Sequence, residues 1–273
     1  FSSTFNLSIM KKIFKSLFFS LLALVPMGMQ AQKLHYNAGL ETSLLWRGLE
    51  VGNGLIFNND VSISDNNGHF KLGLWGGMST DGDYKEADVY FNFNHSGFNL
   101  AVWDLWNFSE GIPGNGKYFT WAADRTSHLT DVAISYDFKP MCNFPLTLTW
   151  ATLVQGRDRG NVARDGNGKI VDPLNEAQNV YSTFVQAAYR LYEDENWNVD
   201  ASVGAAFALN PYDKKYGMDN NLYGKHAGVN DVRLGATYKL KIGKYTLPVG
   251  GQMMWNPEAS KAYFRATVTL LDI

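Results

Sequence analysis

Apolar and polar residues alternate with a period of two along most of the chain after residue 32. In EADVYFNFNHS, residues 86–96, the side chains of Val89, Phe91 and Phe93 share one face, and acidic and amide side chains occupy the other. The same sorting into an apolar face and a charged face occurs at residues 130–138, 196–207 and 231–240. This period is that of β-strands, and no convincing helical period of 3.6 follows the first 31 residues.

The pattern predicts about twelve strands separated by turn-forming residues. We expect them near residues 34–51, 54–65, 69–80, 86–95, 98–109, 129–139, 144–156, 179–193, 196–209, 229–241, 245–256 and 261–271. Every second connection is tight, and three of the intervening connections are long polar loops, at residues 110–128, 157–178 and 210–228.

Short turns on one side and long loops on the other are typical of outer-membrane barrels, which have short periplasmic turns and longer external loops. We therefore predict an all-β fold: a transmembrane, antiparallel, up-and-down β-barrel of about 12 strands. Strands of about ten residues cross the hydrocarbon layer when they are tilted. A soluble, exported β-sandwich is the alternative, because its strands would alternate in the same way.

The first 31 residues are expected to lie outside the folded domain. From Met10 the chain has three lysines, then the apolar run Leu17–Val25, and then a small residue, Ala31, that suits cleavage. This is the arrangement of a secretory signal peptide. We expect residues 1–31 to be an upstream extension and signal peptide, and residues 32–273 to be a single barrel domain.

Composition narrows the classes of function. The net charge of -2 at pH 7 argues against a nucleic-acid-binding protein. Cys142 is the only cysteine, so the fold must be stable without an internal disulfide. Aromatic residues make up 14% of the chain, as expected for a barrel with aromatic girdles.

If the apolar faces meet lipid, the charged faces line the lumen. The predicted lumen-lining residues are Glu41, Arg47, Asp60, Lys71, Asp88, Arg190, Asp200, Arg233, Lys239 and Arg265. Both signs of charge are present, which predicts weak ion selectivity for small polar solutes. The alternative is that these charges pair across strands and fill a narrow bore.

Aromatic residues on the apolar faces are expected to form two girdles at the membrane interfaces. At the outer rim we place Trp46, Trp150 and Trp255, and at the inner rim Tyr136, Trp197 and Tyr238.

The first hairpin is expected to turn at Asn53 and Gly54, because these residue types tolerate positive φ. That register would direct Trp46 to the lipid and place Arg47 opposite Asp60 as an ion pair.

Short motifs at the start of the mature chain resemble those of the TorF-type porin family, which typically shows an aromatic residue before Arg-Gly, a Gly-x-Trp-Gly-Ser element and a Glu-x-Asp-x-Tyr strand. The matching positions are Trp46, Arg47 and Gly48, then Gly73, Trp75 and Gly76, and then Glu86, Asp88 and Tyr90. Gly77 stands where the family tends to have serine. The resemblance implies an outer-membrane barrel of the porin type and supplies no substrate.

Enzymatic barrels are the main competing class. Barrel lipid hydrolases of the phospholipase or lipid A deacylase type place His and Ser two residues apart on one strand, whereas here His95 and Ser96 are adjacent and fall on opposite faces. Catalysis is therefore not expected. The acidic loops around Asp81 and Asp165 could hold Ca²⁺, but neither matches a calcium-binding loop, so we expect no metal and no cofactor.

The stretch KYFTWAAD, residues 117–124, is unusually apolar for an external loop. It could fold inward, pack against another barrel or extend a strand. The expected partners are the lipid bilayer with lipopolysaccharide, the outer-membrane assembly machinery and small polar solutes. We expect an outer-membrane passive channel for small hydrophilic solutes, and the alternatives are a lipid-modifying enzyme of the same architecture and a non-conducting accessory barrel. The sequence does not indicate an oligomeric state.

Overall fold

The computed structural model describes residues 32–112, 114–122, 126–159, 178–211 and 221–273. The expected signal peptide, residues 1–31, lies outside them. The strands are β1 (Lys33–Trp46), β2 (Leu49–Ser64), β3 (Phe70–Ser79), β4 (Lys85–His95), β5 (Phe98–Asn107), β6 (His128–Asp137), β7 (Leu146–Gly156), β8 (Ser182–Glu193), β9 (Trp197–Ala208), β10 (Gly228–Ile242), β11 (Tyr245–Asn256) and β12 (Lys261–Asp272), and a short helix, α2 (Lys139–Cys142), follows β6.

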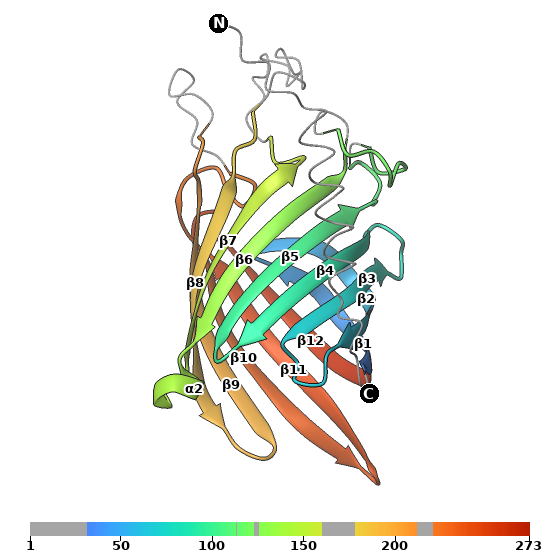
Figure 1. Ribbon diagram of the computed structural model, residues 1–273, viewed down its shortest axis with the longest axis vertical. Coiled ribbons are helices and arrows are strands. Elements are labelled where there is room, and N and C mark those ends of the chain that lie inside the picture. The colour runs from blue at the N-terminus through green and yellow to red at the C-terminus, as the bar shows by residue number, and fades with distance from the viewer. Residues whose placement is uncertain (1–31, 113, 123–125, 160–177, 212–220) are drawn as a thin grey trace, which may run out of the picture. The chain divides into compact units, whose positions relative to one another are not determined.

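The twelve strands form one closed antiparallel barrel in which each strand pairs with its neighbours in sequence, and β1 pairs with β12 (Figure 1). In the closing pair, Leu40 lies opposite Val268 and Glu41 lies opposite Thr267. Closure leaves no unpaired strand edge. The predicted up-and-down barrel is confirmed. No helix among the described residues is long and apolar enough to cross a membrane.

The side chains divide into an apolar outer face and a polar inner face. Leu74 and Phe264 on the outer face are 57% and 63% exposed, whereas the inward-facing Glu41 and Asp88 are each only 4% exposed. A water-soluble protein has the opposite distribution, because burial of apolar surface drives its folding. The exposed apolar face is the one that a surrounding hydrocarbon phase would cover.

The first hairpin differs from the prediction. It turns at Arg47 and Gly48, whose φ angles are +46° and +84°, as in the tight turn that suits the twist of paired strands. Asn37, and not Arg47, therefore lies opposite Asp60. The predicted turn residue Gly54 lies within β2, beside one of two irregularities in the β1–β2 register. Such irregularities bend a strand and redirect its side chains.

The three longest connections all lie at one end of the barrel. The turn end carries the connections at 65–69, 96–97, 138–145, 194–196 and 243–244. The loop end carries the β1–β2 turn and the connections at 80–84, 108–127, 157–181, 209–227 and 257–260. We call these two ends of the barrel the turn end and the loop end.

Candidate functional site

Strand pairing places nine of the ten predicted lumen residues on the inner face. Across β2, β3 and β4, for example, Asp60 pairs with Trp75, which pairs with Asp88, so all three side chains share that face. The nine residues are Glu41, Asp60, Lys71, Asp88, Arg190, Asp200, Arg233, Lys239 and Arg265. Arg47, the tenth, belongs to the loop-end turn.

Most of the lumenal arginines are neutralised by carboxylates. Arg233 donates two hydrogen bonds to Asp231, at 2.6 and 2.7 Å, and Arg265 Nη1 lies 3.1 Å from Glu41 Oε2. Arg190 pairs with Asp200 in the same way. The lumen therefore carries both signs of charge, and these three arginines are each paired with a carboxylate.

At the loop end, Arg47 reaches across the bore. Its Nη1 lies 3.0 Å from Asp131 Oδ1 and its Nη2 lies 2.6 Å from Oδ2, which makes the planar fork that suits a carboxylate. Arg47 Nη1 also donates to the hydroxyl of Tyr223, at 2.6 Å. The predicted Arg47–Asp60 pair is wrong because the turn lies six residues earlier than expected; Asp60 instead accepts a hydrogen bond from Tyr90 Oη at 2.9 Å.

Two asparagines, on β10 and β11, hold the tip of the first hairpin. Asn230 Nδ2 donates to the carbonyl of Arg47, and Asn256 Nδ2 donates to the carbonyl of Gly48, each at 2.9 Å. A Cβ atom on Gly48 would lie only 2.3 Å from the carbonyl oxygen of Asn230. Close approach of the two backbones therefore requires glycine here.

An aromatic and aliphatic cluster fills the bore beside Arg47. Trp46 meets the ring of Tyr223 edge-on, with 5.2 Å between ring centroids, and both contact a core that includes Leu129, Leu153 and Phe184. The prediction that Trp46 faces lipid is wrong, since the displaced turn and the register irregularities carry it inward. We call Arg47, Asp131, Tyr223 and this cluster the constriction.

Asp158 fixes the loop that carries Tyr223. Its carboxylate is fully buried and accepts hydrogen bonds from the backbone N–H and the hydroxyl of Ser182, both at 2.7 Å. Ser182 Oγ in turn accepts from the N–H of Leu222 at 2.7 Å. Burial raises the pKa of Asp158, and the bonds from Ser182 partly offset that shift. The loop predicted at 210–228 is thus folded inward in its described part.

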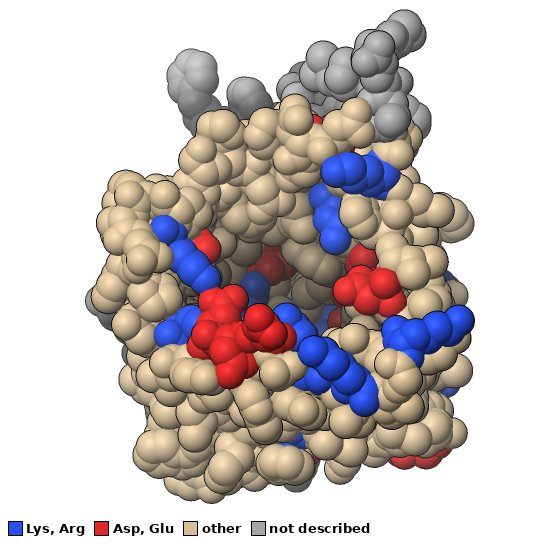
Figure 2. Space-filling model, turned by 90° about the horizontal axis from the view of Figure 1, so that it is seen from below, with Lys and Arg blue, Asp and Glu red and all other residues tan. Residues whose placement is uncertain are grey.

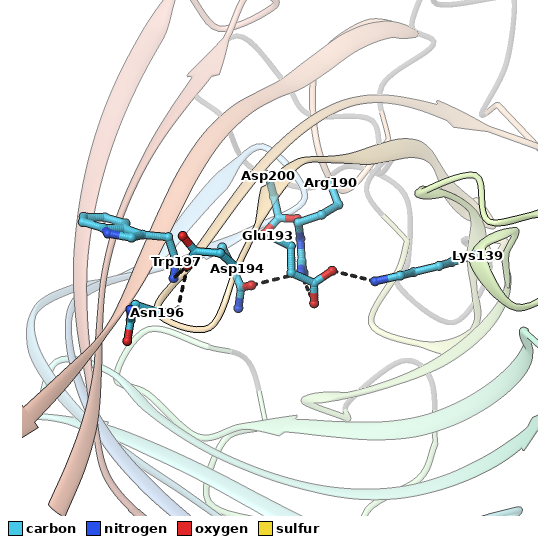
Figure 3. A network of polar contacts seen from close by, with 8 residues as sticks. Lys139, Arg190, Glu193, Asp194, Asn196, Trp197 and Asp200 are labelled. Atoms are coloured by element: carbon cyan, nitrogen blue, oxygen red, sulfur yellow. Dashed lines mark hydrogen bonds and ion pairs between the residues drawn. The ribbon is translucent and has the colours of Figure 1, made fainter.

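Charged side chains surround the hollow at the turn end (Figure 2). Figure 3 shows the contacts around the β8–β9 turn, where Glu193 lies between Lys139 Nζ at 2.5 Å and Arg190 Nη1 at 3.4 Å. Asp194 accepts from the backbone N–H groups of Asn196 and Trp197, at 2.8 and 2.6 Å, and so closes the turn. The turn end therefore has a rim of charged side chains, whereas in the constriction aromatic and aliphatic side chains lie beside the Arg47–Asp131 pair.

The apolar stretch at 117–124 packs on the outer face in its described part and does not narrow the bore. Asp104 and His128 face outward, because their neighbours Leu105 and Leu129 pair on the inner face. His128 Nδ1 lies 2.9 Å from Asp104 Oδ1, and Nε2 donates to the carbonyl of Tyr118 at 2.7 Å. The ring of Trp121 stacks on His128, so the loop covers a polar pair on a face that otherwise bears apolar groups.

Replacing His128 with alanine is expected to destabilise the barrel by about 3 kcal/mol, because it leaves the Asp104 carboxylate without its partner on the apolar wall. The measurement is the temperature at which the folded, fast-migrating form is lost on gels. The Asp104→Asn, His128→Ala double variant should recover part of the loss. Equal melting of the single and double variants would show that the loss does not come from the unpaired Asp104 carboxylate.

The remaining predicted aromatic girdle residues lie on the outer face, where Trp150, Trp197 and Trp255 are all exposed. Tyr238 contacts Trp197, with 4.7 Å between ring centroids, and Tyr136 pairs opposite Phe98 near the turn end. Trp150 pairs with Ile134 and Val185 near the middle of β7, so it does not lie at the rim.

The described residues form neither the His95–Ser96 dyad nor a metal site around Asp81. Ser96 forms the tight β4–β5 turn with a φ of +49°, and the ring of His95 contacts His69 at 3.4 Å. Asp81 accepts hydrogen bonds within its own loop, from Ser79 and Asp83, and Asp165 lies outside the described residues. In the part of the chain that the structure describes, no group of three or more His, Cys, Asp or Glu could hold a metal ion.

No protein-family model and no curated protein matches the chain. Among solved structures, the NanC porin aligns with 87% of this chain and 98% of its own, at 11% identity and a TM-score of 0.42. A triple mutant of the Rh. blastica porin aligns with 89% of this chain and all of its own, at 11% identity and a TM-score of 0.31. Wzi, a carbohydrate-binding β-barrel of Escherichia coli involved in capsule assembly, aligns over 87% of this chain and 55% of its own, at 12% identity and a TM-score of 0.31. With TM-scores below 0.5, these likenesses do not assign the chain to a family.

Proposed function

We propose that the protein is a porin-like passive channel for small hydrophilic solutes in the outer membrane. The observation that carries the proposal is the inverted distribution of side chains, with a charged, polar interior inside an exposed apolar wall. A closed barrel has no free strand edge, which is required of a β-structure in a bilayer. By analogy with barrels of this kind, the turn end faces the periplasm and the loop end faces outward.

The constriction would set the size limit of such a channel. Arg47 and Asp131 place one positive and one negative group in the constriction. Elsewhere in the lumen, Arg233 and Arg265 are each paired with a carboxylate. Small uncharged or weakly charged solutes are therefore the class that fits best. No covalent chemistry is assigned to the lumen.

A non-conducting accessory barrel is the second candidate, and the filled loop end favours it. Trp46, Tyr223 and their apolar neighbours occupy space that an open pore would leave to water. The two functions differ in whether this cluster leaves a path beside it. Efflux of K⁺ from sealed vesicles that contain the purified barrel distinguishes them: release shows a channel, and retention by barrels proven to be inserted shows an accessory role.

Membrane insertion itself has a simple test. The purified barrel should require detergent to stay in solution and should migrate faster on gels before boiling than after, because closed barrels resist unfolding by the gel detergent. A chain that is soluble without detergent and migrates identically in both samples would exclude an outer-membrane barrel.

A further inference from the structure

A layered aromatic platform lines the lumen next to the constriction. Tyr90 lies flat over Gly73, where a Cβ atom would come within 2.3 Å of the ring. Trp103 stacks on Tyr90 with 4.2 Å between ring centroids and an interplanar angle of 22°. Tyr90 is only 3% exposed as a result, while Trp103 remains partly exposed. A glycine on one side and an indole on the other therefore fix the phenol ring in place.

Polar groups surround this platform. Asp60 accepts a hydrogen bond from Tyr90 Oη at 2.9 Å, and Lys71 Nζ lies 5.9 Å from the centre of the Tyr90 ring. Trp103 is the cross-strand partner of Asp131, so the platform lies directly beside the carboxylate that binds Arg47. A solute that passes the constriction would meet the indole face next.

We propose that this platform is a binding subsite for an uncharged saccharide, an inference that rests on the proposed channel function and names its solute class. The C–H groups on one face of a pyranose ring pack against a flat aromatic surface, while its hydroxyl groups need hydrogen-bond partners at the rim. Trp103 supplies the surface, and Asp60 and the inward-facing Asn92 supply acceptors and donors.

The local charges favour an uncharged sugar over an ion. The two positive charges of Lys71 and Arg47 are matched in number by the two negative charges of Asp60 and Asp131, so these four groups together do not favour an ion of either sign. An uncharged sugar loses less hydration free energy than an ion on entering, and stacking together with hydrogen bonds to its hydroxyl groups offsets that loss.

The first test measures ion current through the native barrel in planar bilayers while glucose, maltose or the open-chain polyol sorbitol is added. The ring sugars should reduce the current in a saturable manner, and sorbitol should not. Trp103→Ala should raise the half-blocking sugar concentration roughly tenfold, the effect of about 1.4 kcal/mol of lost binding. Trp103→Phe should retain most of the block, and Trp150→Ala, on the outer face, should leave it unchanged.

A second readout, saturation-transfer NMR of the same sugars with the detergent-solubilised barrel, does not require current. Binding that Trp103→Ala abolishes supports the subsite even if no current flows, in which case only the channel proposal falls. Normal current with no sugar effect in either experiment overturns the subsite and leaves the channel. Equal block by sorbitol, or unchanged block in Trp103→Ala, also overturns it.

Discussion

Replacing Arg47 with alanine is expected to raise the conductance of the barrel and to make it cation-selective. The substitution removes the guanidinium from the bore, with both of its bonds to Asp131 and its bond to Tyr223, while the asparagine bonds to the hairpin backbone remain. It also leaves the Asp131 carboxylate without its guanidinium partner in the constriction. One charge at 4 Å biases ions by about 1 kcal/mol in water and by more in a narrow pore. The K⁺ to Cl⁻ permeability ratio should therefore rise roughly tenfold.

Asp131→Asn is the matched variant, because it removes the opposite charge of the same pair. It should shift the permeability ratio toward Cl⁻, since Arg47 then remains without its carboxylate. Arg47→Lys keeps the charge but loses the planar fork, so it should widen the pore with a smaller change in selectivity. The reversal potential in a KCl gradient reports all three results. A shift of the same sign in Arg47→Ala and Asp131→Asn would contradict the placement of this pair in the conducting path.

Replacing Gly156 with alanine is expected to prevent the barrel from folding, or to destabilise it by more than about 4 kcal/mol. Gly156 ends β7 with a φ of +110°, and a Cβ atom would lie 2.0 Å from the carbonyl oxygen of His128. That oxygen also accepts the N–H of Arg157 at 3.0 Å, so the backbone cannot move away without losing a hydrogen bond. The measured quantity is the fraction of chain that refolds in detergent to the fast-migrating form.

Gly251→Ala is the control for that substitution. Its added Cβ atom would meet nothing closer than the Phe264 ring at 3.7 Å, an ordinary contact, so folding should be nearly unchanged. Native-like refolding of Gly156→Ala would show that the end of β7 has a different backbone conformation.

The sequence predicts the strands well because adjacent side chains must point to opposite faces of a sheet. Except in the first hairpin, every strand begins and ends within three residues of its predicted bounds. The same alternation identifies the polar inner face of each strand, as it does for Asp60 and Asp88. The first hairpin fails because Asn53–Gly54 is a stronger turn signal than Arg47–Gly48, and the two register irregularities leave no mark in the pattern.

The constriction could not be predicted from local patterns. Arg47 meets Asp131 and Tyr223 across 84 and 176 residues of sequence, and such contacts depend on closure of the whole barrel. One missed feature does have a sequence signal. Asp104 and His128 are polar residues at outward positions, and the apolar stretch at 117–124 lies between them in the sequence. Polar outward residues next to an apolar loop indicate that the loop packs over them on the outer face of the barrel.

Single-channel recording of the purified native barrel in planar bilayers tests the central claim most directly. The account predicts discrete, stepwise openings with nearly equal permeability to K⁺ and Cl⁻, because the lumenal charges are paired. The absence of openings in both the native barrel and Arg47→Ala, with insertion established by heat-modifiable migration, would contradict a channel.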